Sequence, residues 1–239
     1  MESLPCEERF SIAESLDILR ETYHYNHWVY DVARDHLGSS LVEVGAGIGN
    51  ITRFLLHHDR VVCVETDPGY MRQLQALRRK HRVLEVVHDD FIRYSERPEA
   101  LGAFDSALCI NVLEHIDDDL GFLRAMLRTV RSGGNVVLFV PAWQFAYGPI
   151  DRRLGHRRRY GKARLVRLAE QSGASVRVLR HFNFVGLFGW FLENRIRGTD
   201  RIDARKARGF NRMVPYLSAL ERLIPPPLGQ SLFMVLEKP

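Results

Sequence analysis

Four polar side chains stand at the ends of four successive short apolar segments: Glu43, Glu65, Asp90 and Asn111. Acids and amides often end strands because they favour water, so each position is ordinary on its own. In a parallel sheet, however, the carboxyl ends of the strands meet at one edge, and ligands bind there. Four such residues in order therefore point into one crevice and indicate a single binding site.

A glycine-rich turn, Gly45-x-Gly47-x-Gly49, directly follows the first of these segments. Glycines allow a tight reversal and let a ligand approach the backbone, and a helix that follows offers free amides. Taken alone, the turn also fits a plain strand-to-helix connection or a dinucleotide site. Its spacing differs from the G-x-G-x-x-G that a pyrophosphate prefers. Glu43 lies two residues earlier, where its carboxylate can meet a cationic amino-acid group. Both features favour S-adenosylmethionine.

The next two acids suit the remainder of that cofactor. Glu65 lies 20 residues after Gly45, where a carboxylate can accept both ribose hydroxyls, a device that nicotinamide enzymes also use. Asp90 is followed by Phe91, so the carboxylate can accept the adenine amino proton while the ring packs on the base. We therefore predict that Glu65 binds the ribose and that Asp90 and Phe91 bind the adenine.

A family resemblance lies in the segments LVEVGAGIGN, VVCVETD, HDDF, FDSALCINVLEHI and SGGNVVLFVPA. They resemble the class I methyltransferase superfamily, in particular its bacterial small-molecule branch, closely over about residues 22–182 and more loosely at the final strand. The resemblance implies a methyltransferase that uses S-adenosylmethionine, releases S-adenosylhomocysteine and has a seven-stranded sheet with an antiparallel last strand. It assigns cofactor roles to Glu43, Gly45, Gly47, Glu65, Asp90, Phe91 and Asn111. Their neighbours Ala46, Asn50, Thr66 and Val112 belong to the same predicted site.

A narrower resemblance involves the stretches 25–28 (YNHW) and 155–160 (GHRRRY), which look like a bacterial subgroup often of unassigned substrate. On that basis Tyr25 and Trp28 are interpreted as part of a helical lid over the cofactor. The alternative for Trp28 is a plain core anchor, which is the usual role of a tryptophan at helical spacing.

The acceptor site is predicted less sharply. His115 follows the fourth strand and is the best candidate for a general base, because an ordinary histidine titrates near neutral pH. The alternative is a structural role, since the family keeps this histidine where no base is needed. The loop after the fifth strand supplies the other candidates for the acceptor site: Trp143, Tyr147, Asp151, His156 and Tyr160. Its aromatic residues form the wall of an acceptor pocket or pack beneath the lid.

Several functional classes are excluded. The sequence Asn-Val-Leu-Glu at 111–114 stands where an amide or adenine N6 methyltransferase has Asp/Asn-Pro-Pro-Tyr. Cys109 lacks the Pro-Cys context of a cytosine C5 enzyme, and the sequence shows no clustered ligand set for a metal.

The three cysteines are scattered without a C-x-x-C pair, which favours a reducing compartment. With no signal peptide or membrane span expected, we predict a cytoplasmic protein.

Positive charge is concentrated in two segments. Residues 152–167 contain eight basic residues and no acid, and residues 195–212 contain seven basic and two acidic residues, against a net charge of +5 for the chain. These segments either pair with acids such as Asp117, Asp119 and Glu193 or bind an anionic partner. We favour a small-molecule acceptor, an aromatic or other secondary metabolite, over RNA or a membrane-associated acceptor, because the sequence shows no basic platform with interleaved aromatics. A cofactor-binding scaffold without catalysis and either a monomer or a homodimer stay open.

The elements that must position these residues follow the hydrophobic pattern. Helix-compatible residues 10–37 precede strands at 41–44, 60–64, 83–87, 104–110 and 135–140, with helices at 51–57, 69–80 and 118–131 between them. This alternation predicts a Rossmann-like, doubly wound α/β sheet. Residues 175–180 and 231–237 form the last strands around an insertion. We predict one domain, made of a helical lid (1–38), a cofactor-binding core (39–140), a substrate loop with the insertion (141–229) and a final strand (230–239).

Overall fold

The computed structural model describes residues 6–239, with side chains from residue 12 onward, and contains one seven-stranded sheet of order β3-β2-β1-β4-β5-β7-β6. Strands β1 to β5 pair in parallel, and β7 runs antiparallel to both β5 and β6. The predicted doubly wound sheet with an antiparallel last strand is confirmed. The strands are β1 (Ser40–Val44), β2 (Arg60–Glu65), β3 (Leu84–His88), β4 (Phe104–Ile110), β5 (Val130–Pro141), β6 (Ser175–Phe182) and β7 (Ser231–Glu237).

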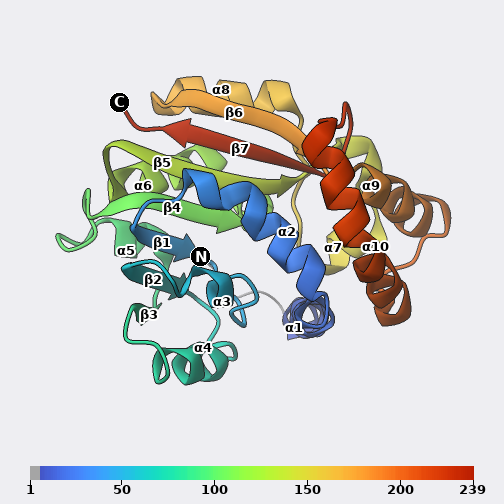
Figure 1. Cartoon of the computed structure of the whole chain (residues 1–239), viewed down its shortest axis with the longest axis horizontal. Coiled ribbons are helices and arrows are strands. Elements are labelled where there is room, and N and C mark those ends of the chain that lie inside the picture. Colours follow the sequence, from blue (N-terminus) through green and yellow to red (C-terminus); the bar gives the residue numbers. More distant parts are fainter. Residues whose placement is uncertain (1–5) are drawn as a thin grey trace.

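Helices cover both faces of this sheet (Figure 1). One core contains residues of α5 (Phe91–Ser95), α6 (Asp119–Thr129) and α8 (Lys162–Ser172). The opposite core contains residues of α2 (Tyr23–Ala33), α4 (Met71–Arg78) and α10 (Ala204–Leu223). Because both faces are buried, β1 and β2 are apolar runs apart from Ser40 and Arg60 at their starts and the acids Glu43 and Glu65. Neither acid belongs to the two hydrophobic cores.

Helix boundaries follow local capping more closely than the apolar pattern. Asp118 is the N-cap of α6, and its carboxylate accepts a hydrogen bond from the Gly121 amide at 2.8 Å. Asp67 instead accepts from the Gly69 amide at 2.7 Å within a turn, so α4 begins later than the predicted residue 69. Helix α3 (Thr52–Leu55) is a single turn, shorter than the predicted 51–57. The core strands were thus predicted better than the helices between them.

The C-terminal half adds helices around the carboxyl ends of the parallel strands. Helix α7 (Pro149–Arg153) lies in the loop after β5, and α9 (Phe184–Phe191), a π-helical turn at 192–196 and α10 fill the segment between β6 and β7. Helix α1 (Cys6–Arg20) contacts α2, α7 and α10, and Figure 1 shows α1, α9 and α10 at this same end of the sheet. Among the described residues, no helix is long and apolar enough to cross a bilayer.

Candidate active site

A cavity of about 1220 Å³ lies at the carboxyl edge of the parallel strands. Its floor is the glycine turn together with Glu65 and Asn111 at the ends of β2 and β4. Helix α1 contributes Leu16, and α9 and α10 contribute Phe188 and Phe210 to the opposite walls. The predicted crevice is therefore present, and it is closed over by helices from both ends of the chain.

The turn after β1 requires its glycines. Gly45, Gly47 and Gly49 all have positive φ, at 69°, 55° and 85°. A Cβ on Gly45 would lie 2.5 Å from Cγ2 of Val112, and one on Gly49 would lie 2.7 Å from Cδ1 of Leu77. The left-handed backbone and the close packing together exclude other residues here. The result is a bare backbone surface that faces the cavity, as a nucleoside-binding turn needs.

Glu65 holds this turn in place. One carboxylate oxygen accepts the Gly47 amide at 2.7 Å, and the other accepts the Thr66 and Asp67 amides at 2.8 and 2.9 Å. Burial raises the pKa of Glu65 despite the hydrogen bonds from those three amides. A carboxylate offers about four acceptor positions, so roughly one is left on the Gly47 side for a ligand hydroxyl. A second ribose hydroxyl would have to replace a backbone amide.

Glu43 lies beneath the turn and lines the same cavity. One of its oxygens accepts from the Thr52 hydroxyl at 2.7 Å and from the Cys63 thiol at 3.2 Å. Burial raises the pKa of Glu43 to about 7, and the neighbouring carboxylate of Glu65 adds to the shift. A buried carboxylate of this kind gains stability from a cationic ligand, and this fits the predicted interaction with the amino group of the cofactor.

Asp90 and Phe91 do not form the predicted pair around a base. Asp90 lines the cavity and is the N-cap of α5, with one oxygen accepting the Ile92 and Arg93 amides at 2.9 and 3.2 Å. The Phe91 ring is buried in the core, 5.5 Å from the ring of Phe122, and is not part of the cavity lining. Because capping starts the helix at Phe91, its first turn directs the ring inward. The expected packing of Phe91 on adenine is thus a wrong prediction.

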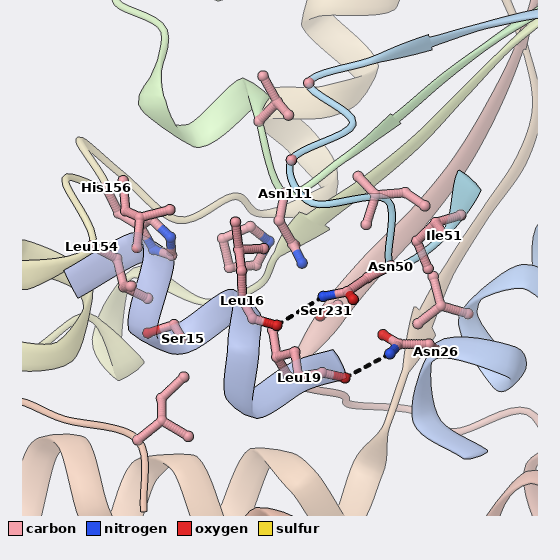
Figure 2. Close-up of a pocket in the computed structure, with 18 of the residues that line it drawn as sticks. Ser15, Leu16, Leu19, Asn26, Asn50, Ile51, Asn111, Leu154, His156 and Ser231 are labelled. Carbon is pink, nitrogen blue, oxygen red and sulfur yellow. Dashed lines mark hydrogen bonds between the residues drawn. The ribbon is translucent and has the colours of Figure 1, made fainter. Parts of the chain in front are cut away.

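Helix α1, and not Trp28, covers the glycine turn. Asn50 and Asn26 donate side-chain hydrogen bonds to the carbonyls of Leu16 and Leu19 at 2.9 and 2.7 Å (Figure 2). A Cβ placed on Gly47 would lie 3.2 Å from Cδ1 of Leu16, so this side chain rests on the turn. Trp28 is 5% exposed and packs against Phe182 with ring centroids 4.1 Å apart, which makes it a core residue.

Tyr25 lines the cavity, and burial raises the pKa of its hydroxyl to about 12. The other residues predicted for the cofactor also line the cavity, apart from Phe91: Glu43, Gly45, Ala46, Gly47, Asn50, Glu65, Thr66, Asp90, Asn111 and Val112. Asn111 has a positive φ of 52° at the end of β4, which turns the chain at the cavity edge. These residues therefore surround one cavity, and their roles toward a cofactor stay predictions.

The acceptor half differs from its prediction, because only His156 of its five loop residues lines the cavity. Trp143 stacks on His181, with ring centroids 5.0 Å apart, and the Tyr147 hydroxyl donates to the His156 carbonyl at 2.7 Å. Tyr160 is fully buried, and its hydroxyl lies 3.1 Å from the Leu113 carbonyl. These aromatic residues pack the loop, and the predicted aromatic wall is instead supplied by Phe188 and Trp190 of α9.

Asp151 organises the loop from a fully buried position. One of its oxygens accepts from Nδ1 of His156 and Nε of Arg159, both at 2.8 Å. The other accepts from the side-chain amide of Asn194 at 2.7 Å and the Gly148 amide at 3.0 Å. Burial alone would raise the pKa of Asp151, but the hydrogen bonds and charges of His156 and Arg159 hold it below its ordinary value. Asp151 is a positioning residue that does not reach the cavity.

His115 ends a short turn after β4 and lines the cavity with its ring nearly perpendicular to that of His156, at a centroid distance of 4.9 Å. Burial, helped by the nearby His156, lowers the pKa of His115 to about 3. A general base works best when its pKa lies near the working pH. The ring is thus neutral at pH 7 but a weak proton acceptor, so the predicted base role for His115 gains no support from its environment.

Comparison with known proteins relates part of the chain to methyltransferases. Residues 42–136 match a family model described as a methyltransferase domain. This segment, which is less than half of the chain, is therefore similar to methyltransferase domains. Ajmaline N-methyltransferase of Rauvolfia serpentina is 27% identical over 101 residues, which span 41% of this chain and 35% of the relative. The chain thus aligns with about a third of the length of that curated relative.

Solved structures of methyltransferases share the fold of this chain. A chain of the complex between the Haloferax volcanii Trm112 methyltransferase activator and a methyltransferase superposes with a TM-score of 0.68 at 17% identity, covering 99% of this chain and 100% of that one. Geranyl diphosphate methyltransferase in complex with SAM gives a TM-score of 0.61 at 13% identity, covering 87% and 84%. That neighbour was solved with SAM, and the glycine turn of this chain, flanked by Glu43 and Glu65, lies at the edge of its own cavity.

A residue that the sequence did not single out completes the acceptor half of the site. Glu114 is fully buried and lies next to His115 and His156, with one ligand atom of each within 4.8 Å of the others. The structure thus brings together three side chains of the kinds that can bind a metal, a grouping that the sequence did not show. His156 comes from a loop far along the chain, so no spacing in the sequence could reveal that the three residues meet.

Part of the positive charge of the two basic segments is paired with acids. Asp119 pairs with Arg158 and Arg164 at 3.2 and 2.7 Å, and Asp117 pairs with Arg157 at 3.0 Å. Glu193 pairs with both Arg197 and Lys206 in the second segment. The interpretation that these segments pair with nearby acids is confirmed for these residues, and the charge left for an anionic partner is smaller than the sequence suggests.

Proposed function

We propose that the protein transfers a methyl group from S-adenosylmethionine to a small-molecule acceptor, a secondary metabolite, bound beside His115 and His156. The observation that carries the proposal is the continuity of the cavity, which runs from the glycine turn to these histidines and to Phe188 of α9. One enclosed space can thus hold a methyl donor and an acceptor side by side. Holding two reactants in line is the main requirement of such a displacement.

The chemistry divides between the ligands and the protein. Bound S-adenosylmethionine supplies a methyl group on a sulfonium sulfur; the acceptor lone pair forms the new bond to that carbon as the carbon–sulfur bond breaks. Glu43, Glu65 and Asp90 hold the donor by its polar groups. Leu16 of α1 covers the turn and excludes water from it. The protein therefore acts mainly by alignment and desolvation.

The acceptor wall favours a partly apolar compound. Val185, Phe188 and Trp190 of α9 line the cavity opposite the glycine turn. The names of two similar proteins, ajmaline N-methyltransferase and geranyl diphosphate methyltransferase, also point to small acceptors. The ion pairs of Asp117, Asp119 and Glu193 weaken the case for RNA. We place the protein in the cytoplasm, because the buried thiols of Cys63 and Cys109 are free.

A membrane-associated acceptor is a second candidate. Apolar side chains are exposed on α9, α10 and the turns beside them, including Phe188 at 56%, Tyr216 at 80% and Leu223 at 80%. Phe188 belongs both to this surface and to the cavity lining. A lipid-like acceptor could therefore reach the site from a bilayer surface.

Methyl transfer from labelled S-adenosylmethionine distinguishes the candidates. The protein is incubated separately with a small-molecule extract, with total RNA and with lipid vesicles, and the label is traced to each fraction. We expect labelled small molecules, and a Phe188→Ser variant with a changed acceptor profile but unchanged cofactor affinity. Label in RNA, with transfer that falls steeply as salt rises, would contradict the proposal; label in the lipid fraction alone would favour the second candidate.

A further inference from the structure

Glu114 is an unusual residue, because it is a fully buried carboxylate with little to hold it. It is 0% exposed, and neither of its oxygens accepts a hydrogen bond from another residue in the described part of the chain. Leaving a buried carboxylate in this state is costly unless a cation is nearby. The nearest basic group is Nε2 of His156, 3.8 Å from one of the oxygens. This distance is too long for a hydrogen bond but suits two ligands of one ion.

His156 is oriented as a metal ligand would be. Its Nδ1 is 2.8 Å from a carboxylate oxygen of Asp151 and donates to it, so Nε2, which faces Glu114, is the nitrogen left to bind an ion. Histidine ligands of metals almost always donate their second nitrogen to such an outer carboxylate. Arg159, Asn194 and the Gly148 amide fix Asp151 in turn. The ring of His156 is therefore positioned in advance by a buried network.

His115 supplies a third nitrogen. Its ring is hydrogen-bonded to the Gly155 backbone, while Nδ1 is buried without a hydrogen-bond partner among the described residues. Bond lengths of about 2.0–2.2 Å place the ligands of one ion about 3–4 Å apart. The ligand atoms of Glu114, His115 and His156 lie within 4.8 Å of one another, so small side-chain rotations close the set.

We propose that Glu114, His115 and His156 bind one divalent transition-metal ion of the Zn²⁺ type. Two imidazoles and one carboxylate are a ligand set that suits Zn²⁺ or Fe²⁺ and disfavours Mg²⁺ and Ca²⁺, which prefer oxygen. Three protein ligands leave at least one coordination position for another group. Both histidines line the cavity, and Figure 2 shows His156 and Asn111 projecting into it, so that position faces the acceptor.

The ion would give the acceptor site a way to activate a hydroxyl group, an inference that rests on the proposed methyl transfer. A metal ion lowers the pKa of a hydroxyl group whose oxygen binds to it. The hydroxyl proton passes to water, the oxygen lone pair forms the bond to the methyl carbon, and the electron pair of the broken carbon–sulfur bond stays on sulfur. The weakly basic His115 then acts as a ligand, and no protein base is required.

Metal titration of the whole chain tests the site without relying on activity. Protein freed of metal with a chelator is titrated with Zn²⁺ by calorimetry and with Co²⁺ by visible absorption. We expect one equivalent to bind, with the absorption bands of coordinated Co²⁺. His156→Ala and Glu114→Gln should each lower the affinity at least about tenfold, and Asp151→Asn should lower it about 10–100-fold. His88→Ala is the matched control, since His88 is exposed and lines the same cavity outside the cluster.

The proposal is overturned if the wild type binds no Zn²⁺ or Co²⁺, or if His156→Ala and His88→Ala bind them equally. Affinity for S-adenosylmethionine is measured on the same samples, because the cofactor site shares none of the three ligands. Cofactor binding without metal binding rejects only the metal site; loss of cofactor binding in the wild type rejects the proposed function. Thermal unfolding identifies a variant that fails to fold, and in that case the remaining ligand variant decides the outcome.

Discussion

The two halves of the active site are built in different ways. The cofactor half uses residues at the ends of successive strands, and their hydrogen-bond partners belong to the adjoining turns, caps and neighbouring strand. The acceptor half depends on contacts between distant segments: Asp151 on α7 holds His156, and Asn194 from the turn after α9 holds Asp151. Local sequence therefore specifies the first half, whereas the second exists only after the fold has formed. The predictions below test that difference, from the largest expected effect to the smallest.

Loss of one buried charge in the acceptor half should lower the free energy of unfolding more than any change in the cofactor half. Asp151→Asn leaves the guanidinium of Arg159, which is 4% exposed, without its partner. Breaking a buried pair in this way should lower the free energy of unfolding by about 3–5 kcal/mol. Asp200→Asn breaks the more exposed pair with Arg153 and should cost less than about 1 kcal/mol. Urea denaturation of both variants measures the contrast, and equal losses would show that the network does not support the loop.

The cofactor half should show a pH dependence that comes from Glu43. Its pKa is about 7 in the folded protein against 4.5 ordinarily, so the native state prefers the protonated form. The stability from this proton is complete below pH 4.5, falls as the pH rises through 7 and is lost above it. Each tenfold change in proton affinity is worth about 1.4 kcal/mol, so the total is about 3 kcal/mol.

Glu43→Gln removes that contribution. Denaturation of both proteins at pH 5 and pH 8 should show a variant whose stability falls less with pH than that of the wild type. Parallel pH profiles would contradict the buried, protonated state of Glu43. Saturating S-adenosylmethionine should reduce the difference, because a cationic amino group favours the charged carboxylate.

Glu65 is predicted to join the glycine turn to the ribose. Its loss should weaken cofactor binding while the protein still folds. Glu65→Ala should lower the affinity for S-adenosylmethionine by about 1–3 kcal/mol, through lost charge-assisted hydrogen bonds and a looser Gly47 amide. Calorimetric titration provides the value. Unchanged affinity would refute the ribose assignment, and Glu85→Ala, an exposed acid on β3, is the control.

The smallest effect should come from helix α1 over the glycine turn, because each variant there removes a single hydrogen bond. Asn26→Ala removes the bond to the Leu19 carbonyl and should loosen α1 by about 1 kcal/mol. The dissociation rate of S-adenosylmethionine, followed by stopped-flow competition, should rise roughly fivefold with little change in unfolding free energy. A rate equal to that of the wild type would show that α1 does not retain the ligand.

The same division explains what could be predicted from the sequence. The strands, the glycine turn and the polar residues at the strand ends follow from apolar runs and spacing, and the structure places them as expected. Phe91 was assigned to the adenine, and Trp28 to a lid over the cofactor with a core anchor as the alternative. Both rings are buried, since a large apolar surface contributes more in the core than at a cavity wall.

Long-range packing accounts for the rest. His156 was predicted only as one of five loop residues, and Glu114 was not predicted as a site residue, because the burial of its carboxylate depends on a loop far along the chain. Helix α9 has a continuous apolar sequence that does not show which face meets the cavity. The basic segments could not be assigned from charge alone, because their acidic partners lie on other elements.

The hydrogen bonds from Asn50 and Asn26 to α1 have a kinetic consequence. Because Leu16 rests on the glycine turn, we expect α1 to open before a methyl donor enters or leaves, so that this opening sets how long a cofactor stays bound. Opening and closing of such elements takes microseconds to milliseconds and often limits turnover. A fast chemical step would then be hidden behind release of S-adenosylhomocysteine, and the first turnover after mixing would be faster than all those that follow.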